Sequence, residues 1–163
     1  MTGPVGVERG RARVSAYVYG NILVLAAVLT ATPHTIRSGH AVVVVLATTV
    51  TTYLAHVVAH AVGAAVGEEK PEGLSRDELR DAVPIMSSGS LPTLILALGA
   101  LMSLDPSLVE GAAAAVVIVR LVGIGAVVDR FSDRTHRRRS WLAGAVVAGV
   151  SVLIVVLKLA FAH

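Results

Sequence analysis

Two histidines four residues apart are the clearest candidates for chemistry in this chain. His56 and His60 lie in a long apolar run, and Tyr53 precedes them on the same helical face. Two imidazoles at this spacing can share a metal ion, pass protons, or bond to hydroxyl groups in a helix bundle. The chain has no Cys, no HExxH motif and no carboxylate inside an apolar run to act as a third ligand. Neutral, hydrogen-bonded histidines are therefore the simplest interpretation, with a proton relay or a metal ion at His56 and His60 as alternatives.

Arg120 is the second candidate, because it lies near the middle of an apolar run and no carboxylate shares its position. A charged side chain at the centre of a bilayer costs at least about 2.5–3.5 kcal/mol. Its guanidinium also has five N–H donors that need acceptors. Backbone carbonyls, Tyr17 or Tyr53 hydroxyls and Asn21 are structural candidates for these acceptors. An anionic substrate, a lipid, or water in a conduction path would make Arg120 functional.

Three serines between two prolines form the third candidate. Ser87, Ser88 and Ser90 lie between Pro84 and Pro92. Pro92 has no N–H for the carbonyl of Ser88 and its ring crowds that carbonyl, which predicts a kinked or opened helix. Opened backbone at membrane depth must line a polar cavity or be buried in protein. The alternative is an ordinary proline kink with the serines bonded to carbonyls four residues back.

The elements that position these residues are apolar runs of membrane-spanning length. Hydrophobic residues make up 55% of the chain and charged residues only 15%, below the roughly 25% of soluble domains. A run of about 18 apolar residues is long enough to span a bilayer. We therefore predict an all-α, polytopic transmembrane bundle of five spanning helices, over residues 14–31, 41–66, 83–104, 111–128 and 142–161.

The basic residues predict a topology with the N-terminus inside and the C-terminus outside. Three Lys or Arg lie in residues 1–13, three in the loop 67–82 and five after the fourth run, whereas the opposite side has only Arg37. The positive-inside rule places the basic side in the cytoplasm. We expect residues 1–13 to form a mobile basic cytoplasmic tail ahead of a single domain, 14–163. In loop 67–82, Ser75 and Glu78 predict a capping box and a short surface helix that begins at Arg76 and runs into the span 83–104.

This topology gives the polar residues of four helices a similar depth. A charged or polar side chain inside a span faces the bundle interior or a cavity, because lipid offers it no partner. We therefore expect one shared pocket, open towards the cytoplasm, for binding or conduction. Its expected lining is Tyr17, Asn21, Tyr53, His56, His60, Ser87, Ser88, Ser90 and Arg120.

The net charge of +3 does not indicate nucleic-acid binding. The Lys and Arg form short clusters beside apolar runs with few aromatic residues, which is typical of topology signals and lipid headgroup contacts. The expected partners are the lipid bilayer and further copies of the chain in a homo-oligomer. No cofactor is expected, apart from the alternative of a metal ion at the histidine pair.

Three segments carry a resemblance to known proteins. The segments AYVYGNILVLAAV (16–28), YLAHVVAH (53–60) and LIVVLKLAFAH (153–163) resemble small multi-pass integral membrane proteins of high-GC bacteria. The resemblance implies a stand-alone protein of the bacterial cytoplasmic membrane. It implies no activity and no functional residues.

These observations leave three functional hypotheses. The first is a small transporter or channel that moves protons or a small anion past Arg120 and His56. The second is a non-catalytic membrane scaffold or accessory subunit whose polar residues hold helices together. The third is a membrane-embedded enzyme with a histidine site, for which no nucleophile or acid–base pair is recognisable.

Overall fold

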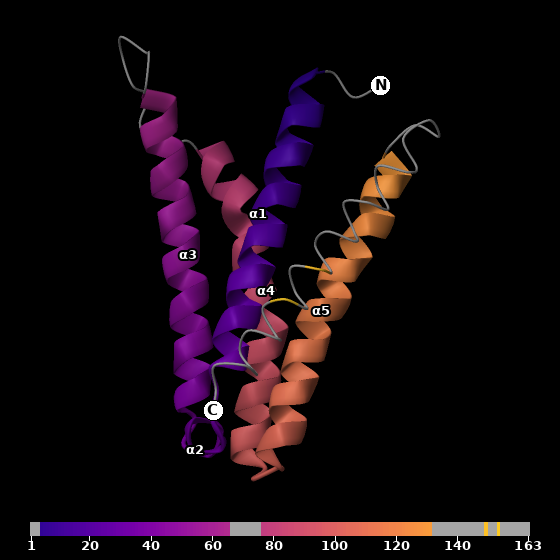
Figure 1. Ribbon diagram of the computed structural model, residues 1–163. Coiled ribbons are helices and arrows are strands. Elements are labelled where there is room, and N and C mark those ends of the chain that lie inside the picture. Colours follow the sequence, from indigo (N-terminus) through magenta and orange to yellow (C-terminus); the bar gives the residue numbers. More distant parts are fainter. Residues whose placement is uncertain (1–3, 66–75, 132–148, 150–152, 154–163) are drawn as a thin grey trace.

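The part of the chain that the structure describes is all-α (Figure 1). This computed structural model describes residues 4–65 and 76–131, together with residues 149 and 153. Its helices are α1 (Pro4–Leu29), α2 (Pro33–Arg37), α3 (His40–Ala65), α4 (Arg76–Leu101) and α5 (Pro106–Phe131). Helices α1, α3, α4 and α5 cover most of the first four predicted apolar runs, which are therefore confirmed as helical.

Four of these helices are long and apolar enough to cross a membrane. The candidate spans are Gly10–Leu29, His40–Gly63, Leu79–Leu101 and Pro106–Ile124. The predicted fifth span, 142–161, lies outside the described residues except for positions 149 and 153. Within the described part, the structure therefore supports a membrane protein with four spans, and the fifth span stays a prediction.

The first helix is longer than the sequence predicted. Residues 4–13 were expected to form a tail, but they are the first turns of α1. Pro4 occupies the first helical position, where its missing N–H breaks no hydrogen bond. Arg13 then reaches Asp81 of α4, with 3.6 Å between Nε and Oδ1. An ion pair of this kind holds the extended end of α1 beside its neighbour.

A short helix that the sequence analysis did not predict joins α1 to α3. Thr32 is the N-cap of α2, and its hydroxyl accepts a hydrogen bond from the backbone N–H of Thr35. Pro33 follows at the first helical position, and Gly39, with a φ of 74°, lies after the end of the helix. The Thr-Pro pair and the glycine are the sequence signal for this helix, because each residue fits its helix boundary.

Asp105 begins α5 at the same end of the molecule. Its Oδ1 accepts hydrogen bonds from the backbone N–H of Ser107 and Leu108, and from the Ser107 hydroxyl. The Ser107 hydroxyl, followed by the backbone N–H of Leu108, holds the pKa of the Asp105 carboxyl below its ordinary value. A carboxylate at this position satisfies free N–H groups of the first turn and complements the helix dipole.

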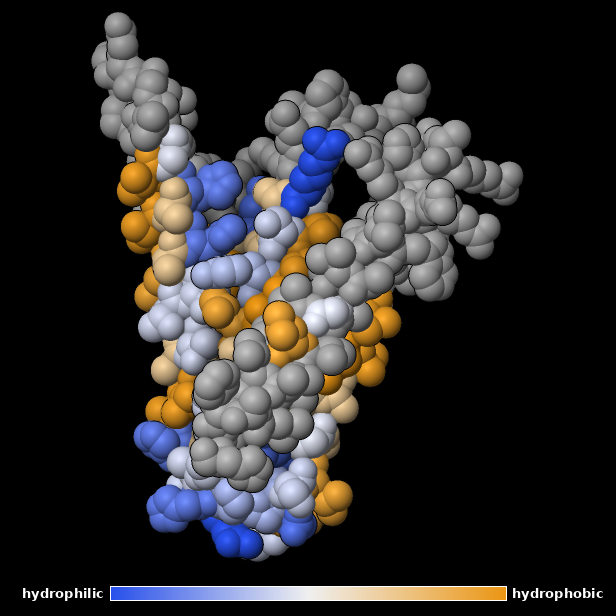
Figure 2. Space-filling model, viewed as in Figure 1, coloured by the Kyte–Doolittle hydropathy of each residue, from blue (hydrophilic) through white to orange (hydrophobic). Residues whose placement is uncertain are grey.

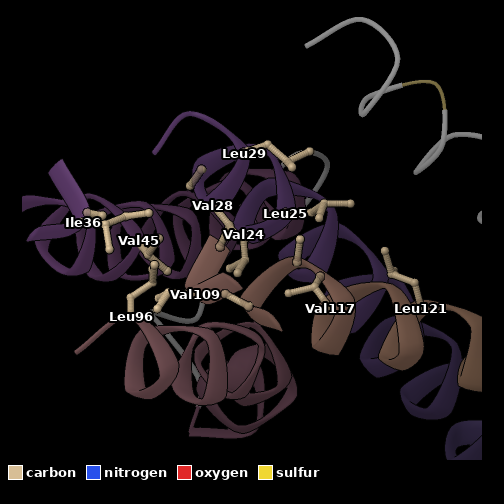
Figure 3. Close-up of a cluster of buried hydrophobic side chains, with 14 residues drawn as sticks. Val24, Leu25, Val28, Leu29, Ile36, Val45, Leu96, Val109, Val117 and Leu121 are labelled. Carbon is tan, nitrogen blue, oxygen red and sulfur yellow. The ribbon is translucent and has the colours of Figure 1, made fainter. Parts of the chain in front are cut away.

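The hydrophobic core fills the half of the bundle next to α2. Val24, Leu25 and Val28 of α1 pack in one cluster with residues of the other helices (Figure 3). The partners shown there are Ile36 of α2, Val45 of α3, Leu96 of α4, and Val109, Val117 and Leu121 of α5. All of these side chains are almost completely buried. This half of the described bundle is therefore closed.

The other ends of the helices diverge. In Figure 1, α3 and α5 lie on opposite sides of α1 and α4, and they separate further with distance from α2. The outward side of α3 is apolar, as the orange surface in Figure 2 shows. Its exposed residues include Val43, Val50, Leu54, Val58 and Val62. Such a face suits contact with lipid chains, which require no polar partner.

Helix α4 is in contact with α1, α2, α3 and α5, and glycines allow three of these approaches. A Cβ on Gly20 of α1 would meet the Ser88 hydroxyl and the backbone of Ile85. A Cβ on Gly89 would overlap Thr49 of α3. Gly99 faces Val109 of α5 at similarly short range. Small residues let helix backbones approach closely in membranes, where van der Waals packing holds helices together.

We therefore expect Gly89→Ala to destabilise the protein by about 1–3 kcal/mol, the usual cost of overpacking. The methyl group would collide with the short, β-branched Thr49 side chain, which has no flexible end that could move aside. The measurement is thermal or chemical unfolding of the purified protein in detergent. Gly111→Ala on α5 is the matched control, because its Cβ would meet nothing within 4 Å. Equal stability of the two variants would contradict the close approach of α3 and α4.

Candidate functional site

Arg120 of α5 binds the backbone of α4. Its Nη1 donates to the carbonyl oxygen of Ser87 at 2.8 Å and to that of Ser88 at 3.2 Å. The acceptors expected from the sequence included backbone carbonyls, and the structure confirms this alternative for Nη1. The hydrogen bonds also join two helices, so Arg120 contributes to the packing of α5 on α4.

Pro92 explains why one of these carbonyls, that of Ser88, is available. In a regular helix the N–H of residue 92 would donate to the carbonyl of Ser88, but proline has no N–H. The free carbonyl in the membrane needs a donor, and Arg120 supplies one. Arg120 lies inside a span and needs acceptors, and Pro92 leaves the Ser88 carbonyl without a donor. The hydrogen bond between Arg120 and Ser88 therefore meets both needs.

The serines complete the hydrogen bonding of α4 locally. The hydroxyls of Ser87, Ser88 and Ser90 donate to the carbonyls of Pro84, Ile85 and Ser87. These acceptors lie three residues back, not four as expected. Helix α4 is continuous from Arg76 to Leu101 with both prolines inside it. The structure therefore favours the ordinary proline-containing helix over an opened one.

Beside Arg120 there is a cleft of about 440 Å³ between α1, α4 and α5. Arg120 and Gly123 line it from α5, and Pro84 lines it from α4. The remaining lining residues are Arg13, Val14 and Tyr17 of α1 and Ile124 of α5. These lining residues belong to the half of the bundle that is farther from α2. Its volume is in the usual range for small-molecule sites, about 300–1,000 Å³.

Among the side chains that the structure describes, the three charged groups at this cleft have a net positive charge. Arg13 is 56% exposed and is paired with Asp81, which is 25% exposed. Arg120 forms its described hydrogen bonds with neutral carbonyl groups, which do not cancel its charge. The sum for Arg13, Asp81 and Arg120 is therefore +1. A positive charge beside apolar walls attracts anions, because its field is screened less there than in water.

The histidine pair lies elsewhere. The rings of His56 and His60 meet edge to face, with their centroids 5.9 Å apart. With Ala59 and Gly63 they line a separate hollow of about 410 Å³ on α3. In the described part of the chain, α3 and α5 do not contact each other. The residues expected to share one pocket therefore lie at two separate sites. Residues at equal depth can point in different directions around the bundle, and depth alone does not distinguish these directions.

No group of three His, Cys, Asp or Glu residues that could hold a metal ion occurs within the described residues. The metal alternative for His56 and His60 stays untested, since a further ligand would have to come from outside this part. Tyr53 is half-buried on the same helix. It is not among the residues that line the hollow with the histidines.

Asn21 is buried one turn below Tyr17. Its Nδ2 donates to the backbone carbonyl of Tyr17 at 2.8 Å, and its Oδ1 has no hydrogen-bond partner among the described residues. Of the nine predicted pocket residues, only Tyr17 and Arg120 line the cleft. Ser87 and Ser88 reach the site through their carbonyl groups.

Sequence reasoning missed Arg13 and Gly123 as site residues. Arg13 was assigned to a tail, although its position one turn before Tyr17 on a continuous helix places both on one face. Gly123 follows Arg120 by three residues and shares its face in the same way. This i, i+3 and i, i+4 spacing was the available signal.

No protein family, curated protein or solved structure matches the chain. The functional interpretation therefore depends on the chemistry of the cleft and on the closed half of the bundle.

Arg120 and Pro92 should be energetically coupled. We expect Arg120→Met to destabilise the protein by about 1–3 kcal/mol, because the Ser88 carbonyl loses its donor. The loss should shrink in a Pro92→Ala background, where a restored backbone N–H can donate to Ser88. Unfolding of the two single variants and the double variant measures the coupling, expected at about 0.5–3 kcal/mol. Strictly additive effects would mean that Arg120 does not compensate for the proline.

Proposed function

We propose that this protein is a small membrane transporter for an anion, which enters the cleft between α1, α4 and α5. The observation that carries the proposal is the net charge of +1 beside an apolar cavity. Arg13 and Arg120 are positive, and Asp81 is negative. A charged residue inside a span marks a ligand or ion pathway more often than a surface charge does. The hydrogen bonds to α4 hold Arg120 in place before an anion arrives.

The geometry favours an anion over protons as the transported species. A proton path would use the titratable pair His56 and His60, but these residues line a hollow on α3 that is separate from the cleft. Arg120 stays protonated in proteins and cannot relay protons. An anion needs only the fixed positive charge, and this is located at the cleft.

The closed half of the bundle favours a transporter over an open channel. Residues such as Leu25, Leu96 and Val117 are fully buried on the α2 side of the cleft. An anion in the cleft would have to wait until these helices separate. Alternating access by rocking of helices is the usual solution for a binding site near the middle of the membrane.

The second candidate function is a membrane scaffold or accessory subunit. A specific observation favours it: the Arg120 hydrogen bonds and the close approaches at Gly20, Gly89 and Gly99 all join helices. In this case the cleft would be a packing defect or a contact for another membrane protein. The histidine site of a membrane enzyme has no comparable support among the described residues.

We also propose a five-span topology in a bacterial cytoplasmic membrane, with the N-terminus inside. Four candidate spans and the eleven-to-one distribution of Lys and Arg support it. Alkaline phosphatase fused after residue 163 should then be active, and green fluorescent protein at the same point should be dark. The opposite pattern would require an even number of spans.

Transport can be tested with purified protein in liposomes. We expect the protein to dissipate an imposed gradient of a small anion such as chloride, methanesulfonate or octanesulfonate, and Arg120→Gln to slow the flux at least tenfold. Gly123→Leu should also slow it, because its side chain would enter the open cleft, where a Cβ meets nothing within 4 Å.

Gly111→Leu is the matched control for this experiment. Gly111 is on the same helix, its Cβ would also meet nothing within 4 Å, and it does not line the cleft. Its flux should equal that of the wild type. If the protein is folded and the liposomes still retain every anion gradient, the protein is not a transporter of these anions, and the scaffold becomes the proposed function.

A further inference from the structure

We propose that the anion bound in the cleft is amphiphilic, with one negative charge on its head and an apolar body. This inference rests on the proposed anion site and names the chemical class of its ligand. It follows from the volume of the cleft, the number of its charges and the chemistry of its walls.

The volume of the cleft exceeds the need of an inorganic ion. A water molecule takes about 30 Å³ of liquid volume, and the cleft measures about 440 Å³. A chloride or phosphate ion would fill a small part of this space and leave the rest to water against apolar walls. Because exposed apolar surface is unfavourable in water, a ligand with an apolar body fits the cleft better.

The charges are suited to a monoanion. Asp81 already neutralises one of the two arginines, since its Oδ1 lies 3.6 Å from Nε of Arg13. The remaining charge belongs to Arg120, whose guanidinium is fixed by the carbonyls of Ser87 and Ser88. A head with one negative charge neutralises this excess. A second negative charge would have to compete with Asp81 for Arg13.

The walls provide a place for the apolar body. Val14, Pro84 and Ile124 offer aliphatic surface, and Tyr17 offers an aromatic ring. Gly123 has no side chain, which keeps the cleft open beside Arg120. A sulfonate, carboxylate or phosphodiester head would contact Arg120 while its hydrocarbon part lies along these residues.

Two sources could supply this chemistry. A water-soluble organic anion would enter from the aqueous side, and an anionic phospholipid would enter from the bilayer. Both have one negative charge on an apolar body, so the experiment below separates them.

The test is calorimetric titration of the full chain in phosphatidylcholine nanodiscs with octanesulfonate, with empty nanodiscs as the reference. We expect saturable binding. Arg120→Gln should bind at least about tenfold more weakly, because a hydrogen bond to a charged group contributes about tenfold or more. Gly123→Leu should bind at least about tenfold more weakly because its side chain fills the cleft. Gly111→Leu should bind like the wild type. Circular dichroism and gel filtration check that each variant is folded, and Gly123→Leu retains the Arg120 side chain.

Methanesulfonate is the decisive comparison, because it has the same head without the apolar body. We expect it to bind at least tenfold more weakly than octanesulfonate. Equal binding of the two would overturn the amphiphile and leave the small-anion transporter standing. Equal octanesulfonate binding by Gly123→Leu and Gly111→Leu would also overturn it. Saturable binding without flux in liposomes would instead remove the transport proposal and keep the ligand class.

Replacing part of the phosphatidylcholine with phosphatidylglycerol identifies the source. If the lipid occupies the cleft, wild-type affinity for octanesulfonate should fall severalfold in these nanodiscs, which supports an anionic phospholipid as ligand. Unchanged affinity supports a water-soluble organic anion. In both cases the difference between octanesulfonate and methanesulfonate must persist.

Discussion

The hydrogen bonds from Arg120 to α4 satisfy the constraint on which the bundle depends: backbone polar groups in a membrane need partners within the protein. Pro92 removes the partner of the Ser88 carbonyl, and Arg120 replaces it from another helix. The arginine in turn obtains acceptors that a bilayer does not offer. A charged residue and a helix-breaking residue, each unfavourable alone, are stable together because each supplies what the other lacks.

This contact acts on a helix that touches all the others in the described part of the chain. Close approaches at Gly20 and Gly89 bring α1 and α3 against α4 near its serines, and Gly99 brings α5 against it nearer to α2. The apolar core then fills the α2 half (Figure 3). In the other half, α1 and α5 are far enough apart to leave a cleft. The same packing therefore produces a closed half and an open one.

The separation of the arginine from the histidines defines what the cleft can do. A fixed guanidinium beside apolar walls can attract and orient an anion but cannot transfer protons. The imidazoles, which can transfer protons, line another hollow on α3. In the described structure the cleft and the hollow of the histidines are consequently separate sites. Within the described part of the chain, α1 and α4 lie between α3 and α5 and would carry any coupling between the two sites (Figure 1).

The sequence alone determined the class of the protein, because apolar runs of spanning length admit few structures other than membrane helices. It also indicated that Arg120 and Pro92 need unusual partners. Only the tertiary structure decided that they are each other's partners, and that His56 and His60 are apart from Arg120. Periodicity gives each residue a depth and a face on its own helix. Which faces meet depends on contacts between helices such as Gly89 with Thr49, and the pattern of a single helix does not contain that information.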